Sequence, residues 1–226
     1  MKKIIRVWDL PIRLFHWLLL ICIIVSFISV KIGGNAMEIH ARAGYCVLAL
    51  ILFRICWGFI GSHHARFINF IPKPRTLLSF VSGKTQAGLG HNPLGALSVL
   101  ALIFSIGVQA VTGLFANDDI SFEGPFAKYV SNSTVSFLNS IHHLNETVLI
   151  VLIALHLCAI LYYYKYKGEN LVKPMIMGDK EIDPSEEAKY SPTDLGQTSK
   201  DGGLQRGFAL LLLSLIAVIL TYLITA

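Results

Sequence analysis

Five long apolar stretches, nearly free of charged side chains, alternate with polar segments along this chain. A membrane helix needs roughly 20 apolar residues, so each stretch is long enough to cross a bilayer. None of them shows the strict alternation of apolar and polar residues that marks a transmembrane barrel strand. The pattern therefore predicts an all-α membrane protein, a four-helix bundle followed by a fifth, C-terminal span. The predicted spans are 14–30, 43–61, 94–116, 147–164 and 207–226.

A polar stretch separates the fourth apolar run from the fifth. It contains DKEIDPSEEAKYSPTDLGQTSKDGG, whose mixed charge, proline and glycine are typical of a flexible linker. We therefore expect a four-helix domain at 1–167, a cytoplasmic linker at 168–206 and a C-terminal transmembrane helix at 207–226. The first run is long for the core of a signal peptide and lacks a clear small-residue cleavage site, so it is expected to remain as a span.

The composition agrees with a membrane protein. Of the 226 residues, 54% are hydrophobic and 15% are charged, which is too apolar for a soluble domain of this size. The net charge of +5 comes from bases that flank the apolar runs, so it carries no indication of nucleic-acid binding. The four cysteines all lie inside apolar stretches and form neither CxxC nor CxxCH, which argues against a disulfide framework, a thiolate metal site and covalently attached haem.

The bases beside the spans predict the orientation of the chain. Cytoplasmic flanks of membrane helices carry an excess of lysine and arginine. The bases on the expected cytoplasmic side are Lys2, Lys3, Arg6, Arg13, Arg66, Lys73, Arg75, Lys84, Lys165, Lys167 and Lys173. The charged residues of the two opposite loops are Lys31, Glu38, Asp118, Asp119, Glu123 and Lys128. We therefore expect a multi-pass membrane protein with its amino terminus in the cytoplasm and its carboxyl terminus outside.

Histidines lie at two depths of the predicted bundle, where imidazoles are costly unless they have a partner. His142 and His156 are 14 residues apart, which is about 21 Å along a helix and roughly 40° from one face. His143 lies about 140° away from the face of His156. If the first span runs outward and the second returns, His16 lies at the inner level with His156, and His40 lies at the outer level with His142. Each level then holds two imidazoles from two helices.

Two imidazoles at one level suit a six-coordinate haem b. Haem iron accepts histidine as an axial ligand, and helical bundles build cofactor sites from facing helices. A zinc ion would need three or four ligands at one level. The sequence therefore predicts two haems b, held by His16 with His156 near the cytoplasm and by His40 with His142 near the outside. With both axial positions filled, such haems would transfer electrons.

Arg54 is a charged residue inside the second apolar run. A charge at mid-bilayer costs at least about 2.5 kcal/mol unless it finds a partner or reaches water. Arg54 follows His40 by 14 residues, which places it about 21 Å deeper and near the same face of the helix. We expect it to pair with a propionate of the inner haem, with snorkelling to the cytoplasmic surface as the alternative.

The remaining histidines and the tryptophans carry weaker signals. His63, His64 and His91 lie in the expected cytoplasmic loop, where a solvated or interfacial role is the default and contact with a metal or quinone is the alternative. The tryptophans at Trp8, Trp17 and Trp57 lie close to the span ends. They are expected to be interfacial anchors, with haem packing as the alternative.

Four segments of the chain carry a more specific pattern. They are RLFHWLLL, HARAGYCVLALILFRICWGFIGSHHARF, GHNPLGALSVLALI and IHHLNETVLIVLIALHLCAIL. Together they resemble the bacterial cytochrome b561 and nickel-iron hydrogenase b-type cytochrome family, over residues 5 to about 175. The resemblance implies a four-helix dihaem core that links a quinone pool to a partner redox protein. The family usually has His-Glu where this chain has His142 and His143, which leaves the ligand at this place open between the two.

These observations predict transmembrane electron transfer between the quinone pool and a periplasmic partner, either a c-type cytochrome or a dehydrogenase subunit. The alternative within this class is a membrane-anchor cytochrome b subunit of a hydrogenase or another dehydrogenase. A metal-ion transporter or a structural anchor would belong to another class. A transporter should show polar residues along a path, and the first four spans have almost none. Quinol oxidation would make the protein an enzyme, and electron shuttling alone would not.

Overall fold

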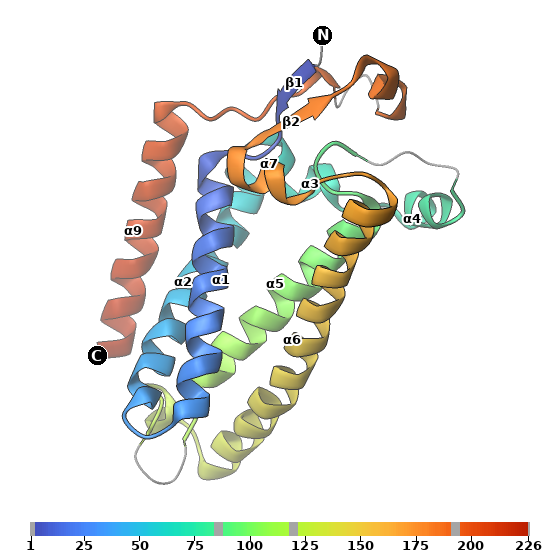
Figure 1. The fold of residues 1–226 in the computed structure, drawn as a ribbon. Helices are drawn as coiled ribbons and strands as arrows, with labels where there is room; N and C mark the ends of the chain where they lie inside the picture. The colour runs from blue at the N-terminus through green and yellow to red at the C-terminus, as the bar shows by residue number, and fades with distance from the viewer. Residues whose placement is uncertain (1–2, 84–87, 118–121, 191–194, 226) are drawn as a thin grey trace. The chain divides into compact units, whose positions relative to one another are not determined.

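The computed structural model describes residues 3–83, 88–117, 122–190 and 195–225 (Figure 1). Within these ranges, five helices are long and apolar enough to cross a membrane. They are α1 (Leu10–Ile32), α2 (Ala36–Ile60), α5 (Pro93–Gly113), α6 (Asn132–Tyr166) and α9 (Gly203–Thr225). Each helix overlaps one apolar run, so the prediction of an all-α membrane protein with five spans is confirmed. Of the charged residues used for the orientation, Lys2, Lys84, Asp118 and Asp119 lie outside the described residues.

Polar side chains cap several of the long helices. The carboxylate of Asp9 accepts a hydrogen bond from the backbone N–H of Ile12 at 2.9 Å, which satisfies a donor in the first turn of α1. Asn92 caps α5 in the same way through the N–H of Gly95 at 2.7 Å, directly before Pro93 at the first helical position. Ser131 accepts the N–H of Thr134 at the start of α6. These caps explain why the helices begin before their apolar runs.

Shorter elements connect the long helices. The helical ones are η1 (His63–Ala65), α3 (Phe67–Phe70), α4 (Pro74–Val81), η2 (Ala127–Tyr129), α7 (Val172–Met177) and η3 (Pro184–Lys189). Two strands, β1 (Lys3–Arg6) and β2 (Asp179–Ile182), pair antiparallel, with Arg6 opposite Asp179.

Residues 168–206, predicted to be a flexible linker, contain α7, β2 and η3. Ile182 of β2 packs with Ile5 and Leu89 in a small apolar core, which the polar composition around it concealed. The backbone N–H of Ser199 also donates to the carbonyl of Arg6 at 2.7 Å. This local structure was not predicted, and the division at 167 and 206 stays a prediction.

The chain forms two compact units, and each contains part of every long helix. Unit 1 comprises Met1–Leu14, Ile55–Ala101 and Ala154–Ala209. Unit 2 comprises Phe15–Arg54, Leu102–Ile153 and Leu210–Ala226.

Asp9 and Trp57 form a fully buried pair in unit 1. Their exposed fractions are 0% and 1%, and the indole N–H of Trp57 donates to Asp9 Oδ2 at 3.0 Å. The indole also packs on Phe208 of α9, with 6.2 Å between ring centroids. The interpretation of Trp57 as an interfacial anchor was wrong, because a buried carboxylate supplies the partner that an indole otherwise finds at the membrane surface.

An ionic cluster in unit 1 ties the N-terminal strand to the segment before α9. Arg6 donates to both carboxylate oxygens of Asp179, at 2.7 and 3.0 Å, and to Asp201 at 2.9 Å. The hydrogen bonds from Arg6 hold the pKa of Asp179 below its usual value. Burial by itself would raise the pKa of Asp201, but hydrogen bonds from Arg206 and from the N–H of Leu10 outweigh it and lower that pKa.

Candidate functional site

A cavity of about 210 Å³ lies in unit 2, lined by residues of α1, α2, α5 and α6 and of the segment between α5 and α6. Most of its lining side chains are aliphatic or aromatic, and among the polar ones are His40 and His142. A single buried water needs only about 15 Å³ measured in this way, so the cavity has room for a much larger group.

The imidazoles of His40 and His142 face each other across this site. Their ring centroids are 6.4 Å apart and their planes are inclined by 77°. Nδ1 of His40 lies 3.0 Å from the backbone carbonyl oxygen of Ser26, and Nδ1 of His142 lies 3.0 Å from Oγ1 of Thr112. A carbonyl oxygen can only accept, so Nδ1 of His40 carries the proton and its Nε2 keeps the lone pair that a metal ion needs.

Two glycines shape the walls around these rings. A Cβ atom at Gly113 of α5 would lie 3.2 Å from Cε1 of His142, closer than an ordinary contact. A Cβ atom at Gly44 of α2, which lines the cavity, would meet no atom within 4 Å. Gly113 therefore lets the His142 ring lie against α5, and Gly44 leaves the space beside α2 open.

A buried polar network holds α5 and α6 in register beside the cavity. The hydroxyl of Ser105 donates to Asn145 Oδ1 at 2.8 Å, and the amide of Asn145 donates back to the Ser105 carbonyl at 2.9 Å. The same amide donates to Oε1 of Gln109, a cavity-lining residue, at 2.7 Å. Because Asn145 lies three residues after His142, the network fixes the height at which His142 meets the cavity.

His143 has a different position from His142. It also lines the cavity, but its side chain is exposed, whereas His142 is partly buried. The two rings are 6.3 Å apart, at 84° to each other. Among the described contacts, the ring that faces His40 is that of His142. The geometry therefore favours His142 over His143 as a ligand.

The other predicted site residues are His16 of α1, His156 of α6 and Arg54 of α2. His16 is partly buried in α1, within unit 2, and its ring meets that of Trp17 edge-on at 5.2 Å. His156 is partly buried in the part of α6 that belongs to unit 1. The two residues belong to different units, and their pairing stays a prediction. Arg54, in α2, is only 3% exposed, which agrees poorly with a side chain that snorkels to water.

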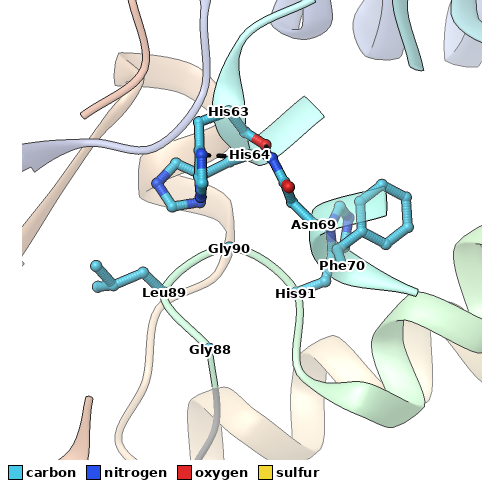
Figure 2. Close-up of a pocket in the computed structure, with 8 residues that line it drawn as sticks. All are labelled: His63, His64, Asn69, Phe70, Gly88, Leu89, Gly90 and His91. Carbon is cyan, nitrogen blue, oxygen red and sulfur yellow. Dashed lines mark hydrogen bonds between the residues drawn. The ribbon is translucent and has the colours of Figure 1, made fainter. Parts of the chain in front are cut away.

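A smaller cavity of about 70 Å³ lies in unit 1 and contains three histidines (Figure 2). His64 is only 7% exposed and its Nε2 lies 3.1 Å from the carbonyl oxygen of Gln197. His91 lies against Phe70, with 4.6 Å between ring centroids, and Asn69 donates to the carbonyl of His63 at 2.7 Å (Figure 2). Of the solvated or interfacial role expected for His64, its burial contradicts the solvated one, and the interfacial one stays a prediction. The described residues include no group of three or more histidines, cysteines or carboxylates that could hold a metal ion.

Comparison with known proteins gives the family. The family model described as prokaryotic cytochrome b561 matches residues 7–178. This chain belongs to the prokaryotic cytochrome b561 family. It is therefore a multi-pass bacterial membrane cytochrome b, a class of electron-transport protein that binds haem b, and the resemblance seen in the sequence is confirmed.

Several relatives have names that point to one kind of complex. The chain is 25% identical over 210 residues to a probable Ni/Fe-hydrogenase B-type cytochrome subunit of Azotobacter chroococcum mcd 1, covering 77% of this chain and 87% of the relative. It is 23% identical over 219 residues to the subunit of the same name from Bradyrhizobium diazoefficiens, covering 80% and 87%. It is 24% identical over 214 residues to that of Rhodobacter capsulatus, covering 78% and 81%.

The cavity between His40 and His142 fits the haem b that a cytochrome b561 implies. Two metal–imidazole bonds of about 2 Å place the ligating nitrogens about 4 Å apart, and the ring centroids then lie roughly 6 Å apart. The observed 6.4 Å between His40 and His142 agrees with this spacing. Their Nδ1 atoms are both engaged by protein oxygen atoms, and the open space beside Gly44 can admit a flat group. The residues present therefore fit a bis-histidine haem.

Sequence reasoning missed several residues around the cavity. They are Thr112, which contacts His142, the carbonyl of Ser26, which contacts His40, and Gln109, which contacts Asn145 of α6. Threonine and serine are common in membrane helices, where they bond back to their own backbone, so composition alone does not distinguish them. Gln109 lies three and four residues before Thr112 and Gly113, so the three residues share one side of the helix. This spacing was the available sign that they could line a common site.

Proposed function

We propose that this cytochrome b carries electrons across the bacterial cytoplasmic membrane, between the quinone pool and a redox partner on the periplasmic side, through two bis-histidine haems. The observation that carries this proposal is the pair of facing imidazoles of His40 and His142, each oriented by a protein oxygen atom at 3.0 Å. Histidines bound to a haem iron from both sides would leave it no position for another ligand, which would favour electron transfer over the binding of small molecules.

Each of the two proposed haems has two histidine ligands. His40 and His142 would hold the outer haem, and His16 with His156 would hold the inner one. Haem b supplies one-electron exchange between ferrous and ferric iron. The chain supplies the ligands, an apolar surrounding that excludes water, and the charge of Arg54 for a propionate of the inner haem. The exposed fraction of Arg54, 3%, supports a role inside the protein.

The proposal includes an orientation and a partner. The amino terminus lies in the cytoplasm, as the bases at the span ends predict, and residues 168–206 lie on the same side before α9 returns across the membrane. Quinone is the proposed partner within the membrane. The names of the relatives favour a Ni/Fe-hydrogenase or a related dehydrogenase over a c-type cytochrome as the periplasmic partner.

Haem stoichiometry tests the proposal. The purified protein should bind two haems b per chain by the pyridine haemochrome assay, and acid acetone should extract both. His142→Ala should leave one haem, and His143→Ala is the matched control that should leave two. One haem in the unaltered protein, or two in the His142 variant, would contradict the assignment.

The partner needs a second measurement. Membranes that contain the periplasmic hydrogenase should reduce the cytochrome's haem in the presence of hydrogen gas. In membranes without this protein, hydrogen should no longer reduce an added quinone. Haem that stays oxidised under hydrogen but is reduced by a quinol would favour a c-type cytochrome as the partner.

A further inference from the structure

Thr112 is a buried threonine of α5 whose hydroxyl contacts a proposed haem ligand. Its exposed fraction is 5%, and its Oγ1 lies 3.0 Å from Nδ1 of His142. The same oxygen donates to the carbonyl of Val108, four residues earlier, at 2.7 Å, with the carbonyl of Gln109 at 3.1 Å as a second acceptor. The hydroxyl therefore lies between its own helix and the imidazole on α6.

The number of protons decides the direction of the contact. A hydroxyl group has one hydrogen, and the short contact to Val108 occupies it. Oγ1 of Thr112 can then only accept from His142, so Nδ1 of His142 carries the ring proton. This assigns the tautomer in which Nε2 holds the lone pair that can bind iron.

Thr112 also restricts how the ring can turn. The hydrogen bond holds Nδ1 of the His142 ring, and the adjacent Cε1 lies close to the backbone at Gly113, so this edge of the ring has little room to move. In this position the ring plane is inclined by 77° to that of His40. Partners of this kind raise the basicity of a metal-ligating imidazole as well as orient it.

We propose that Thr112 is a positioning residue for the outer haem, which fixes the tautomer and plane of His142 and keeps the haem's midpoint potential low. The inference rests on the proposed function, because it requires His142 to be a ligand. An imidazole that donates from Nδ1 gives more electron density to iron, which stabilises the ferric state. His40 receives the same support from the backbone carbonyl of Ser26, so Thr112 is the side chain through which this support can be removed by substitution.

The experiment compares three variants of the full-length, haem-loaded protein. Thr112→Val keeps the shape and removes the acceptor, Thr112→Ser keeps the hydroxyl, and Thr221→Val on the exposed face of α9 is the matched control. Redox titration and low-temperature EPR of the ferric protein are the measurements. The outer haem is identified as the component that is missing in His40→Ala.

We expect Thr112→Val to retain two haems while the potential of the outer haem rises and its low-spin EPR signal shifts, because the ring plane of His142 is no longer fixed. Thr112→Ser and Thr221→Val should match the unaltered protein. If Thr112→Val loses the outer haem, retention of that haem in Thr112→Ser still supports the inference, and its loss there overturns it.

Two other results would be decisive against the inference. An outer haem with unchanged potential and EPR signal in Thr112→Val would overturn the role of Thr112 and leave the dihaem proposal standing. An unaltered protein that lacks the outer haem would overturn the proposed function and this inference together.

Discussion

Replacing Gly113 with alanine should weaken the binding of the proposed outer haem without destabilising α5. The added Cβ atom would lie 3.2 Å from Cε1 and 3.6 Å from Nδ1 of His142. Carbon atoms pack at about 3.5 to 4.0 Å, so the ring must move by roughly 0.3 to 0.8 Å. This movement lengthens the 3.0 Å contact with Thr112 toward the limit of a hydrogen bond.

The expected loss of haem affinity follows from the contact between Thr112 and His142. Loss of a hydrogen bond of this kind costs about 1 kcal/mol, which corresponds to roughly fivefold weaker haem binding. Alanine is a better helix former than glycine by up to about 1 kcal/mol, which offsets the loss of this hydrogen bond in the apoprotein, so its free energy of unfolding should change little. The assay is the haem-to-protein ratio during stepwise dilution in detergent, with the apoprotein's thermal unfolding measured in parallel.

Gly107→Ala on the same helix is the matched control. A Cβ atom there would meet Cγ2 of Ile51 at 3.8 Å, an ordinary contact that needs no movement. Both haems should be retained in this variant as in the unaltered protein. If Gly113→Ala and Gly107→Ala retain the outer haem equally well, the close approach of His142 to α5 does not control its binding, and the reasoning fails.

Three further predictions concern other parts of the chain. Arg54→Gln should retain both haems and lower the inner potential by tens of millivolts in a redox titration, since about 1 kcal/mol of charge interaction is roughly 40 mV for one electron; an unchanged potential would contradict the propionate pairing. Gly44→Leu should fill the outer cavity and halve the haem-to-protein ratio, and a ratio of two would show that haem lies elsewhere. The lowered pKa values of Asp179 and Asp201 predict that residues 179–190 and 195–206 resist limited proteolysis fully above about pH 4, and that this resistance is lost as the pH falls through those values. Asp201→Asn should reduce the resistance at neutral pH, and resistance that is independent of pH would refute the ionic origin.

The sequence predicted the spans because bilayer thickness sets a length that an apolar run either reaches or does not. It also predicted that His40 and His142 come together, since helical spacing and the direction of each span place them at one depth. The small core of Ile5, Leu89 and Ile182 lay outside such reasoning. Its members are far apart in the sequence, and a four-residue strand in a polar segment has no periodicity long enough to recognise.

Trp57 illustrates a different limit of prediction from sequence. Its position near the end of an apolar run predicted an interfacial anchor, because indoles in membrane proteins commonly lie where one end is apolar and the other is wet. The structure instead pairs it with Asp9, 48 residues away in the chain, at 3.0 Å. A pair of this kind depends on which helix ends meet, and hydropathy along a single chain carries no information about that.

The site between His40 and His142 combines an apolar lining with polar groups that are already paired within the protein. Ser105 pairs with Asn145, and the accepting oxygen atoms of Thr112 and of the Ser26 carbonyl hold the two imidazoles. Groups held by such bonds reorient little when the charge of a nearby group changes, and a dry surrounding strengthens the interactions among them. If His40 and His142 hold a haem as proposed, surroundings that move little between oxidation states would speed its electron exchange, so the hydrogen bonds that orient the two imidazoles would also favour rapid electron transfer.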